Sequence, residues 1–212
     1  MAGRNVTICA GVSGMGKSTF GLRYLVNAPL AIRYLFDAES SERNPQRNEF
    51  ADRLRISSAG DVYGLSLGLC RGWIAFDPHQ LFHGQLEAAL AFFLDWAWET
   101  AARIPGNKVV VVDEIWRYCS PQGIPAELAN IVQSGRKRGL HLLLNTQEPN
   151  RLNSTIINGA SEIVCFRLQS RTALKMIADY GFNGEEVASL PALQFVARNM
   201  DSGGELRGRI KL

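Results

Sequence analysis

Gly11-Val12-Ser13-Gly14-Met15-Gly16-Lys17-Ser18 is the stretch that decides the fold of this 212-residue chain. It fits the pattern G-x-x-x-x-G-K-[ST] without a mismatch. The apolar run before it, Val6 to Ala10, predicts a buried strand, and Ser18 to Val26 after it predicts a helix. The three glycines let successive backbone N–H groups point at phosphate oxygens, and the helix N-terminus adds its positive end. The stretch therefore predicts a phosphate-binding loop.

Within this loop, individual residues have expected roles toward a nucleotide. Lys17 is expected to reach the β- and γ-phosphates, and Ser18 is expected to bind Mg²⁺. The residues that we expect to contact ATP are Gly11, Val12, Ser13, Gly14, Met15, Gly16, Lys17, Ser18 and Thr19.

A second motif follows four consecutive valines, Val109 to Val112, which predict a strand buried on both faces, as in parallel sheets. Asp113, at the carboxyl end of that strand, is placed to hold the water shell of Mg²⁺. Glu114 can orient and deprotonate a water in line with the γ-phosphate. A solvated turn is the alternative. Because a hydrolase must polarise water whereas a small-molecule kinase must exclude it, Asp113-Glu114 favours ATP hydrolysis coupled to motion.

The next predicted strand begins at His141 and ends in Thr146-Gln147. At the carboxyl edge of a parallel sheet, Gln147 can bridge the γ-phosphate, or the attacking water, to whatever the protein moves. Between the two strands lies the cationic stretch Ser134 to Gly139. Its charges can simply complement a helix dipole. Alternatively, Arg136 or its neighbour Arg138 is an arginine finger that completes a neighbouring subunit's site, with another cation facing DNA.

Strands and helices alternate along most of the chain, which predicts an α/β fold with a mainly parallel sheet in a single domain, residues 1–212. The further strands are expected at Ala31–Phe36, Trp73–Phe76, Lys108–Asp113, Leu140–Asn145 and Glu162–Leu168. The further helices are expected at Gln85–Arg103, Ala126–Arg138 and Arg171–Tyr180. Leu193–Arg198 and Glu205–Ile210 predict a terminal hairpin.

Composition limits the class of protein. Hydrophobic residues make up 46% and charged residues 20% of the chain, which excludes a mainly disordered protein. The net charge of +3 is too small to demand a nucleic-acid partner, yet a local basic face is possible. The cysteines, Cys9, Cys70, Cys119 and Cys165, have no metal-binding spacing and are expected to be reduced. No signal peptide is visible and Leu86 to Trp98 is too short to span a bilayer, so we expect a soluble, intracellular protein.

Three weaker features leave alternatives open. Asp77, His79 and His83 could form a metal site, although a loop with solvent-facing histidines is favoured. Arg43 to Arg55 contains both signs of charge and is expected to be a solvated face. Phe92 and Trp96 form a line beside the core-facing stripe of their helix and belong either to the core or to a subunit contact.

Together, residues 11–18, Asp113-Glu114-Ile115-Trp116, Gly135 to Gly139 and Leu142 to Pro149 resemble the FtsK/HerA superfamily of DNA-pumping ATPases. The resemblance covers roughly residues 5–170 and implies a RecA-like P-loop NTPase that uses ATP and Mg²⁺. It assigns catalytic roles to Lys17, Glu114 and Gln147, places Asp113 and Ser18 at the metal, and matches the family arginine to Arg136.

The layout is similar to the genome-packaging ATPases of tectivirus-like, membrane-containing icosahedral viruses, because neither a membrane segment with a winged helix nor an N-terminal barrel is visible. This implies a ring, expected to be a hexamer, that drives double-stranded DNA into a preformed capsid. The expected partners are capsid or membrane vertex proteins, and the expected location is the virion packaging vertex or the host cytoplasm. A conjugation or mobile-element ATPase, a filamentous-phage assembly factor and a P-loop nucleotide kinase remain alternatives.

Overall fold

The computed structural model describes residues 5–38, 55–56, 72–79 and 81–211. The strands are β1 (Val6–Ala10), β2 (Ile32–Phe36), β3 (Arg55–Ile56), β4 (Trp73–Phe76), β5 (Lys108–Val112), β6 (Leu140–Thr146), β7 (Ala160–Cys165), β8 (Gln194–Asn199) and β9 (Glu205–Arg209). The helices are α1 (Lys17–Asn27), α3 (Leu86–Arg103), α4 (Ala126–Ser134), α5 (Ser154–Asn158), α6 (Arg171–Asp179) and α7 (Gly184–Ser189). Short 3-10 helices cover Ile115–Arg117, Gly135–Arg138 and Pro149–Arg151.

The strands follow the hydrogen-bonded order β3-β4-β2-β5-β6-β1-β7-β8-β9. Strands β3, β4, β2 and β5 pair in parallel, as do β1 and β7. The pairs β7–β8 and β8–β9 are antiparallel and form the hairpin at the C-terminal end. The α/β class, the mainly parallel sheet and the C-terminal hairpin are therefore confirmed.

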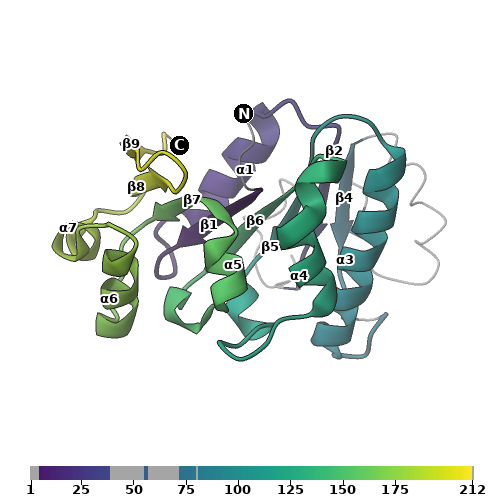
Figure 1. Ribbon diagram of the computed structural model, residues 1–212, viewed down its shortest axis with the longest axis horizontal. Helices are drawn as coiled ribbons and strands as arrows, with labels where there is room; N and C mark the ends of the chain where they lie inside the picture. Colours follow the sequence, from purple (N-terminus) through teal and green to yellow (C-terminus); the bar gives the residue numbers. More distant parts are fainter. Residues whose placement is uncertain (1–4, 39–54, 57–71, 80, 212) are drawn as a thin grey trace. The chain divides into compact units, whose positions relative to one another are not determined.

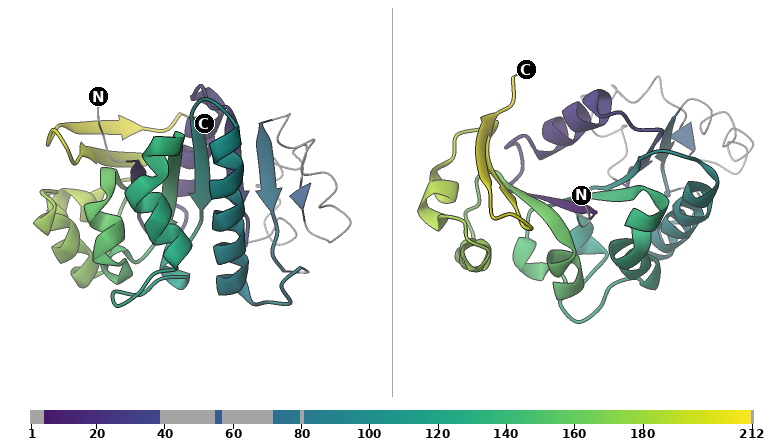
Figure 2. Two further views of the ribbon diagram at one scale, coloured as in Figure 1. Left: turned by 45° about the vertical axis from the view of Figure 1, so that its right-hand side comes forward. Right: turned by 45° about the horizontal axis from the view of Figure 1, so that its top comes forward.

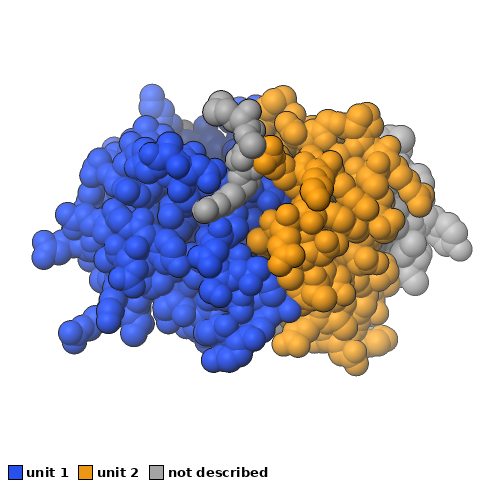
Figure 3. Space-filling model, in the orientation of Figure 1, with its two compact units in different colours: residues 1–27, 114–124, 143–212 blue, residues 28–113, 125–142 orange. Residues whose placement is uncertain are grey.

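Contacts divide the chain into two compact units, which Figure 3 colours separately. Unit 1 comprises residues 1–27, 114–124 and 143–212, and unit 2 comprises residues 28–113 and 125–142. Strand β6 contributes to both units. Whether the chain behaves as one domain in solution stays a prediction.

Unit 1 is built around strands β1 and β7, with α1 on one side of them and α5 on the other (Figure 2). Most residues of these strands are apolar and buried, including Ile8, Ile163 and Val164. Helices α6 and α7 pack against each other next to the hairpin β8–β9 (Figure 1). The side chains of Asn153, Ser170 and Asn183 cap the N-termini of α5, α6 and α7, because each accepts a backbone N–H of the first turn.

In unit 2, α3 and α4 lie side by side over one face of the parallel strands (Figure 1). The buried face of α3 presents Leu90, Phe93 and Leu94 at helical spacing. Phe93 packs in ring contacts with Phe36 and Phe76 of the strands. Burying three such aromatic rings together contributes strongly to the stability of this unit.

Lys108 is a buried cation at the start of β5, and its Nζ donates to the carbonyls of Ala101 and Ile104 at the C-terminal end of α3. These carbonyls have no partner within the helix, so the ammonium group satisfies them. Replacing Lys108 by methionine should lower the free energy of unfolding by about 1–3 kcal/mol, because buried acceptors lose their donor. Urea titration of the variant, with exposed Lys137→Met as the control, measures this loss. Equal stability of the two variants would contradict it.

Most element boundaries agree with the sequence prediction to within two residues. Two differ in a way that concerns the site. The helix predicted from Ala126 to Arg138 ends at Ser134 and continues as a 3-10 turn, which Gly139 terminates at φ +62°. A Cβ at Gly139 would lie 2.7 Å from the carbonyl oxygen of Gly106. The strand predicted to include Asp113 ends at Val112.

Among the weaker features, His79 and His83 lie in a turn rather than a helix, and His79 Nδ1 lies 2.8 Å from Asp77 Oδ1. Within the described residues, no group of three or more His, Cys, Asp or Glu side chains could hold a metal ion.

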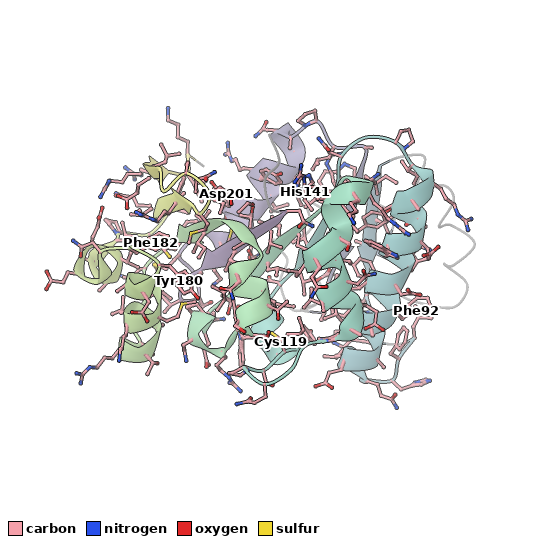
Figure 4. The ribbon with its side chains drawn as sticks, viewed as in Figure 1. Phe92, Cys119, His141, Tyr180, Phe182 and Asp201 are labelled. Carbon is pink, nitrogen blue, oxygen red and sulfur yellow. The ribbon has the colours of Figure 1, made fainter. Side chains whose placement is uncertain are left out.

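Phe92 is 53% exposed on the outer side of α3 (Figure 4), whereas Trp96 packs on Tyr34. The stretch Arg43 to Arg55 lies outside the described residues, apart from its last position. No helix in the described part of the chain is both long and apolar enough to cross a membrane.

Candidate functional site

The predicted phosphate loop lies in unit 1, between the end of β1 and the start of α1. The N–H of Gly11 donates to the carbonyl of Thr146 at 3.1 Å, and the N–H of Val12 donates to the carbonyl of Arg167 at 2.9 Å. The loop is thereby tied to the residues that end β6 and follow β7. A Cβ at Gly11 would lie 2.7 Å from the Cβ of Phe166, so the chain here requires glycine. The carboxyl edge of the strands thus carries the loop, as the sequence predicts.

Lys17 begins α1, and its side chain folds back over the loop. Its Nζ donates to the carbonyl of Gly11 at 2.7 Å and to that of Val12 at 3.3 Å. The residue is only 6% exposed. A buried ammonium group held at the mouth of a loop of backbone N–H groups fits a phosphate group well. Ser18 and Thr19 follow in the first turn of α1 and are half-buried.

The far side of the loop is supported by the C-terminal hairpin, which the sequence prediction did not connect to the site. Leu193 donates its N–H to the carbonyl of Met15 at 3.0 Å and accepts the N–H of Ile210 at 2.8 Å. Gly16 has φ +109°, and a Cβ there would lie 2.9 Å from Leu193 Cδ2. Glycine is required at position 16 both by its backbone conformation and by this contact.

Glu114 and Gln147, which the sequence assigns to one site, do meet in unit 1. Gln147 Nε2 donates to Glu114 Oε1 at 2.7 Å. Trp116 Nε1 donates to the other carboxylate oxygen, Oε2, at 2.6 Å. Glu114 is 7% exposed and adopts a left-handed backbone conformation, φ +49° and ψ +47°. A non-glycine residue in this region is strained, and such strain gathers at functional sites.

The segment after β6 completes this part of unit 1. Arg151 places its guanidinium 4.7 Å from the centroid of the Trp116 ring, and Arg117 lies 5.8 Å from the same ring. Glu148 pairs with Arg151 at 3.5 Å, and its own N–H donates to Thr146 Oγ1 at 3.1 Å. Trp116 is thus in contact with the carboxylate on one edge and with cations on its faces. The sequence analysis names Trp116 only as part of a motif and assigns it no role, although it stands two residues after Glu114.

Cys119 follows in the same segment of unit 1 (Figure 4). Its thiol donates to the carbonyl of Ile115 at 3.2 Å, and burial raises the pKa of Cys119 to about 11. Burial also raises the pKa of Cys165. Because both thiols stay protonated at neutral pH, neither is an activated nucleophile. Among the described residues, Cys9, Cys119 and Cys165 form no disulfide.

Asp113, Arg136 and Arg138 belong to unit 2. Asp113 is 9% exposed and directly precedes Glu114 in the chain. Arg138 is engaged: its Nη1 donates to the carbonyl of Trp98 at 2.7 Å, its guanidinium lies 3.8 Å from the Trp98 ring centroid, and it pairs with Glu99 at 3.6 Å. Arg136 is exposed, and its side chain forms no hydrogen bond or ion pair with the residues that the structure describes. Of the two arginines, Arg136 is therefore the one available to a partner.

Two of the residues predicted to bind Mg²⁺ carry oxygen groups of the kind that this ion prefers. Ser18 offers a hydroxyl and Asp113 a carboxylate, which are hard oxygen ligands. Mg²⁺ commonly uses one or two such protein ligands together with substrate phosphates. When bound, the ion would neutralise charge that develops on the phosphates.

Comparisons with known proteins bear on the fold. No protein-family model matches the sequence, and no curated protein matches it either. Among solved structures, the genome packaging NTPase B204 from Sulfolobus turreted icosahedral virus 2, in complex with AMP, has a TM-score of 0.74 at 18% identity, covering 100% of both chains. VirB4 of Thermoanaerobacter pseudethanolicus has a TM-score of 0.69 at 14% identity, over 98% of this chain and 89% of that chain.

The bacterial conjugative coupling protein TrwB, in its unbound form, has a TM-score of 0.63 at 11% identity, over 98% of this chain and 85% of that chain. At such identities the likeness shows the fold. The chain has a RecA-like α/β fold, which confirms the fold expected from the sequence.

Proposed function

We propose that the protein is a Mg²⁺-dependent ATPase that moves double-stranded DNA, and that it serves as a viral genome-packaging motor. One observation carries the enzymatic part: in unit 1, a phosphate loop with a buried Lys17 accompanies a buried Glu114 whose carboxylate is hydrogen-bonded by Gln147 at 2.7 Å. A cation for the phosphates and an oriented carboxylate for a water are the groups that nucleotide hydrolysis requires.

In this proposal the chain's own residues divide the work. The backbone N–H groups of residues 11–18 and the ammonium group of Lys17 bind and orient the phosphates. Glu114 accepts a proton from the attacking water. Gln147 holds the Glu114 carboxylate in a fixed position relative to the γ-phosphate. Ser18 and Asp113 hold the metal ion. Each of these groups acts most strongly where negative charge develops during the reaction.

The proposed ring rests on Arg136. An exposed guanidinium without a partner among the described residues can reach the site of an adjacent subunit, where it would act as an arginine finger. Lys137, also exposed, is then available to DNA phosphates, and a ring multiplies such contacts several-fold. The hexamer, the capsid or membrane vertex partners, and the location at the packaging vertex or in the host cytoplasm belong to this same proposal.

The proposal is tested by measuring phosphate release from ATP with and without double-stranded DNA. We expect hydrolysis that DNA stimulates, and light scattering should show a larger assembly with a non-hydrolysable ATP analogue. Transfer of the phosphate to a nucleoside monophosphate would instead establish a kinase. A rate of hydrolysis that double-stranded DNA does not change would contradict a DNA translocase.

A conjugative ATPase is the second candidate, because the conjugative coupling protein TrwB has the same fold. Addition of empty capsids distinguishes the two. A packaging motor should make DNA resistant to nuclease in the presence of ATP and empty capsids, whereas a conjugative ATPase should leave the DNA digestible.

Replacing Glu114 by glutamine should keep the side-chain shape and remove the base. We expect ATP affinity close to wild type and hydrolysis lower by roughly 10²–10⁴-fold. Calorimetric titration of ATP and single-turnover phosphate release measure the two quantities separately. Glu185→Gln, which changes an exposed carboxylate of α7 in the same unit, is the control and should hydrolyse ATP at a rate near wild type. A Glu114→Gln protein that fails to bind ATP would show a structural or metal-binding role instead.

A further inference from the structure

Both oxygens of the Glu114 carboxylate are hydrogen-bonded, and the two donors differ in what else they can do. Gln147 directly follows β6 and donates to Oε1, whereas Trp116 lies on the 3-10 turn after Glu114 and donates to Oε2. An ionised carboxylate offers about four acceptor sites. These two bonds use two of those sites and orient the carboxylate.

The orientation needs such support. The terminal torsion of a glutamate is broad and roughly two-fold, so an isolated carboxylate rotates freely. At Glu114 the backbone is already left-handed, and the N–H of Arg117 donates to the carbonyl of Glu114 at 3.0 Å. This turn directs the side chain, and the indole N–H at 2.6 Å fixes its last torsion. Bonds to an ionised acceptor are about twice as strong as neutral ones.

The indole is itself held in place. Arg151 lies over its ring at 4.7 Å, and Glu148 holds Arg151 at 3.5 Å. A large, half-buried ring with a cation on its face has little freedom to rotate. The chain of contacts runs from Glu148 through Arg151 and Trp116 to the carboxylate, all within unit 1.

We propose that Trp116 is a positioning residue for Glu114: its indole N–H holds the carboxylate in the orientation from which Glu114 accepts a proton from water. This inference rests on the proposed hydrolysis. It adds a residue whose role is to fix the base, separate from Gln147, which can also contact the phosphate region.

Two variants separate the N–H from the ring. Trp116→Phe keeps an aromatic face for Arg151 and removes the donor, whereas Trp116→Gln keeps an N–H donor and removes the ring. We expect Trp116→Phe to lower kcat by roughly 10–100-fold with KM nearly unchanged, because a misplaced base affects the chemical step. Trp116→Gln should recover a large part of that loss. Trp73→Phe, which alters a half-buried indole in unit 2, should not change kcat.

The hydrogen bond itself is observable without turnover. In a ¹⁵N-labelled protein, the four tryptophans give four indole N–H resonances, and the one that Trp116→Phe removes belongs to Trp116. We expect this resonance to lie downfield and to exchange slowly with solvent, and Glu114→Ala should move it upfield and speed its exchange.

The outcomes distinguish the two proposals. Wild-type protein without ATP hydrolysis overturns the proposed function and, with it, this role of Trp116. Wild-type hydrolysis with an unchanged kcat in Trp116→Phe overturns only the positioning role. A Phe variant that is more active than the Gln variant also overturns it, because the ring and not the N–H would then matter. If Glu114→Ala leaves the chemical shift and the exchange rate of the Trp116 indole N–H unchanged, the hydrogen bond is absent in solution.

Discussion

Replacing Lys17 by alanine should abolish ATP hydrolysis and weaken ATP binding. The ammonium group is buried and held 2.7 Å from the carbonyl of Gly11, at the mouth of the phosphate loop. In such a water-poor site a charge acts on the phosphates far more strongly than it would in solvent. Loss of a single neutral donor at a reacting oxygen already costs about 10²–10³-fold in kcat, so loss of a full charge should exceed this. Phosphate release and calorimetric titration of ATP measure the two effects.

The control for this variant is Lys175→Ala, which removes an exposed lysine from α6 in the same unit. It should hydrolyse ATP as the wild type does. Urea unfolding should show that Lys17→Ala remains folded, so that the loss of turnover can be assigned to the missing ammonium group. Turnover at the wild-type rate in Lys17→Ala would refute the phosphate-loop assignment.

The sequence predicts the phosphate loop because its signals are local. A buried strand, three glycines and a helix follow one another within about twenty residues, and the structure places Gly11 and Gly16 where a Cβ would collide. The meeting of Glu114 and Gln147 is predictable for a different reason. Parallel strands bring their carboxyl ends to one edge of a sheet, so residues that follow two such strands meet there.

The role of Trp116 could not be predicted in this way. Its indole reaches Glu114 only because Glu114 takes a left-handed backbone conformation and the chain then forms a 3-10 turn. Glutamate has no particular preference for that region, so no local propensity indicates it. The only available signal was proximity, since an aromatic N–H two residues from a candidate base is a possible donor.

Long-range contacts explain the other differences. Leu193 supports the phosphate loop from a left-handed backbone conformation, φ +66°, which a leucine in the sequence does not predict. The loop and Leu193 are also far apart in the sequence. The charges at Arg136 and Arg138 look alike in the sequence. They differ in the structure because Arg138 is held by Trp98, which lies forty residues earlier in the chain. Arg138 donates a hydrogen bond to the Trp98 carbonyl and contacts the Trp98 ring. Tertiary packing, which local pattern does not encode, thus separates the two candidates.

Replacing Arg136 by alanine should leave ATP affinity nearly intact and lower turnover by about 10³–10⁵-fold, the usual effect of an arginine finger. The guanidinium is exposed and is not engaged by the described residues, so it can act on the charge that develops at an adjacent subunit's γ-phosphate. Such a group stabilises the transition state and contributes little to ground-state binding. Lys137→Ala, which removes the neighbouring exposed charge, is the matched control and should lower basal turnover by less than about 10-fold, because a point charge lacks the fork geometry of arginine.

Mixing Arg136→Ala with Lys17→Ala subunits tests whether the arginine acts between subunits. Each variant alone should be inactive, yet a mixed ring contains interfaces where an intact Lys17 faces an intact Arg136 of its neighbour. Hydrolysis with DNA present should therefore rise from zero, pass through a maximum near equal amounts of the two variants, and fall again. An arginine that acts within its own subunit cannot give this rescue, because every subunit in the mixture lacks one of the two groups. If light scattering shows mixed rings and activity stays at zero across all ratios, Arg136 does not act in trans. The same mixture made with Arg138→Ala would then show whether Arg138 leaves Trp98 to take that role.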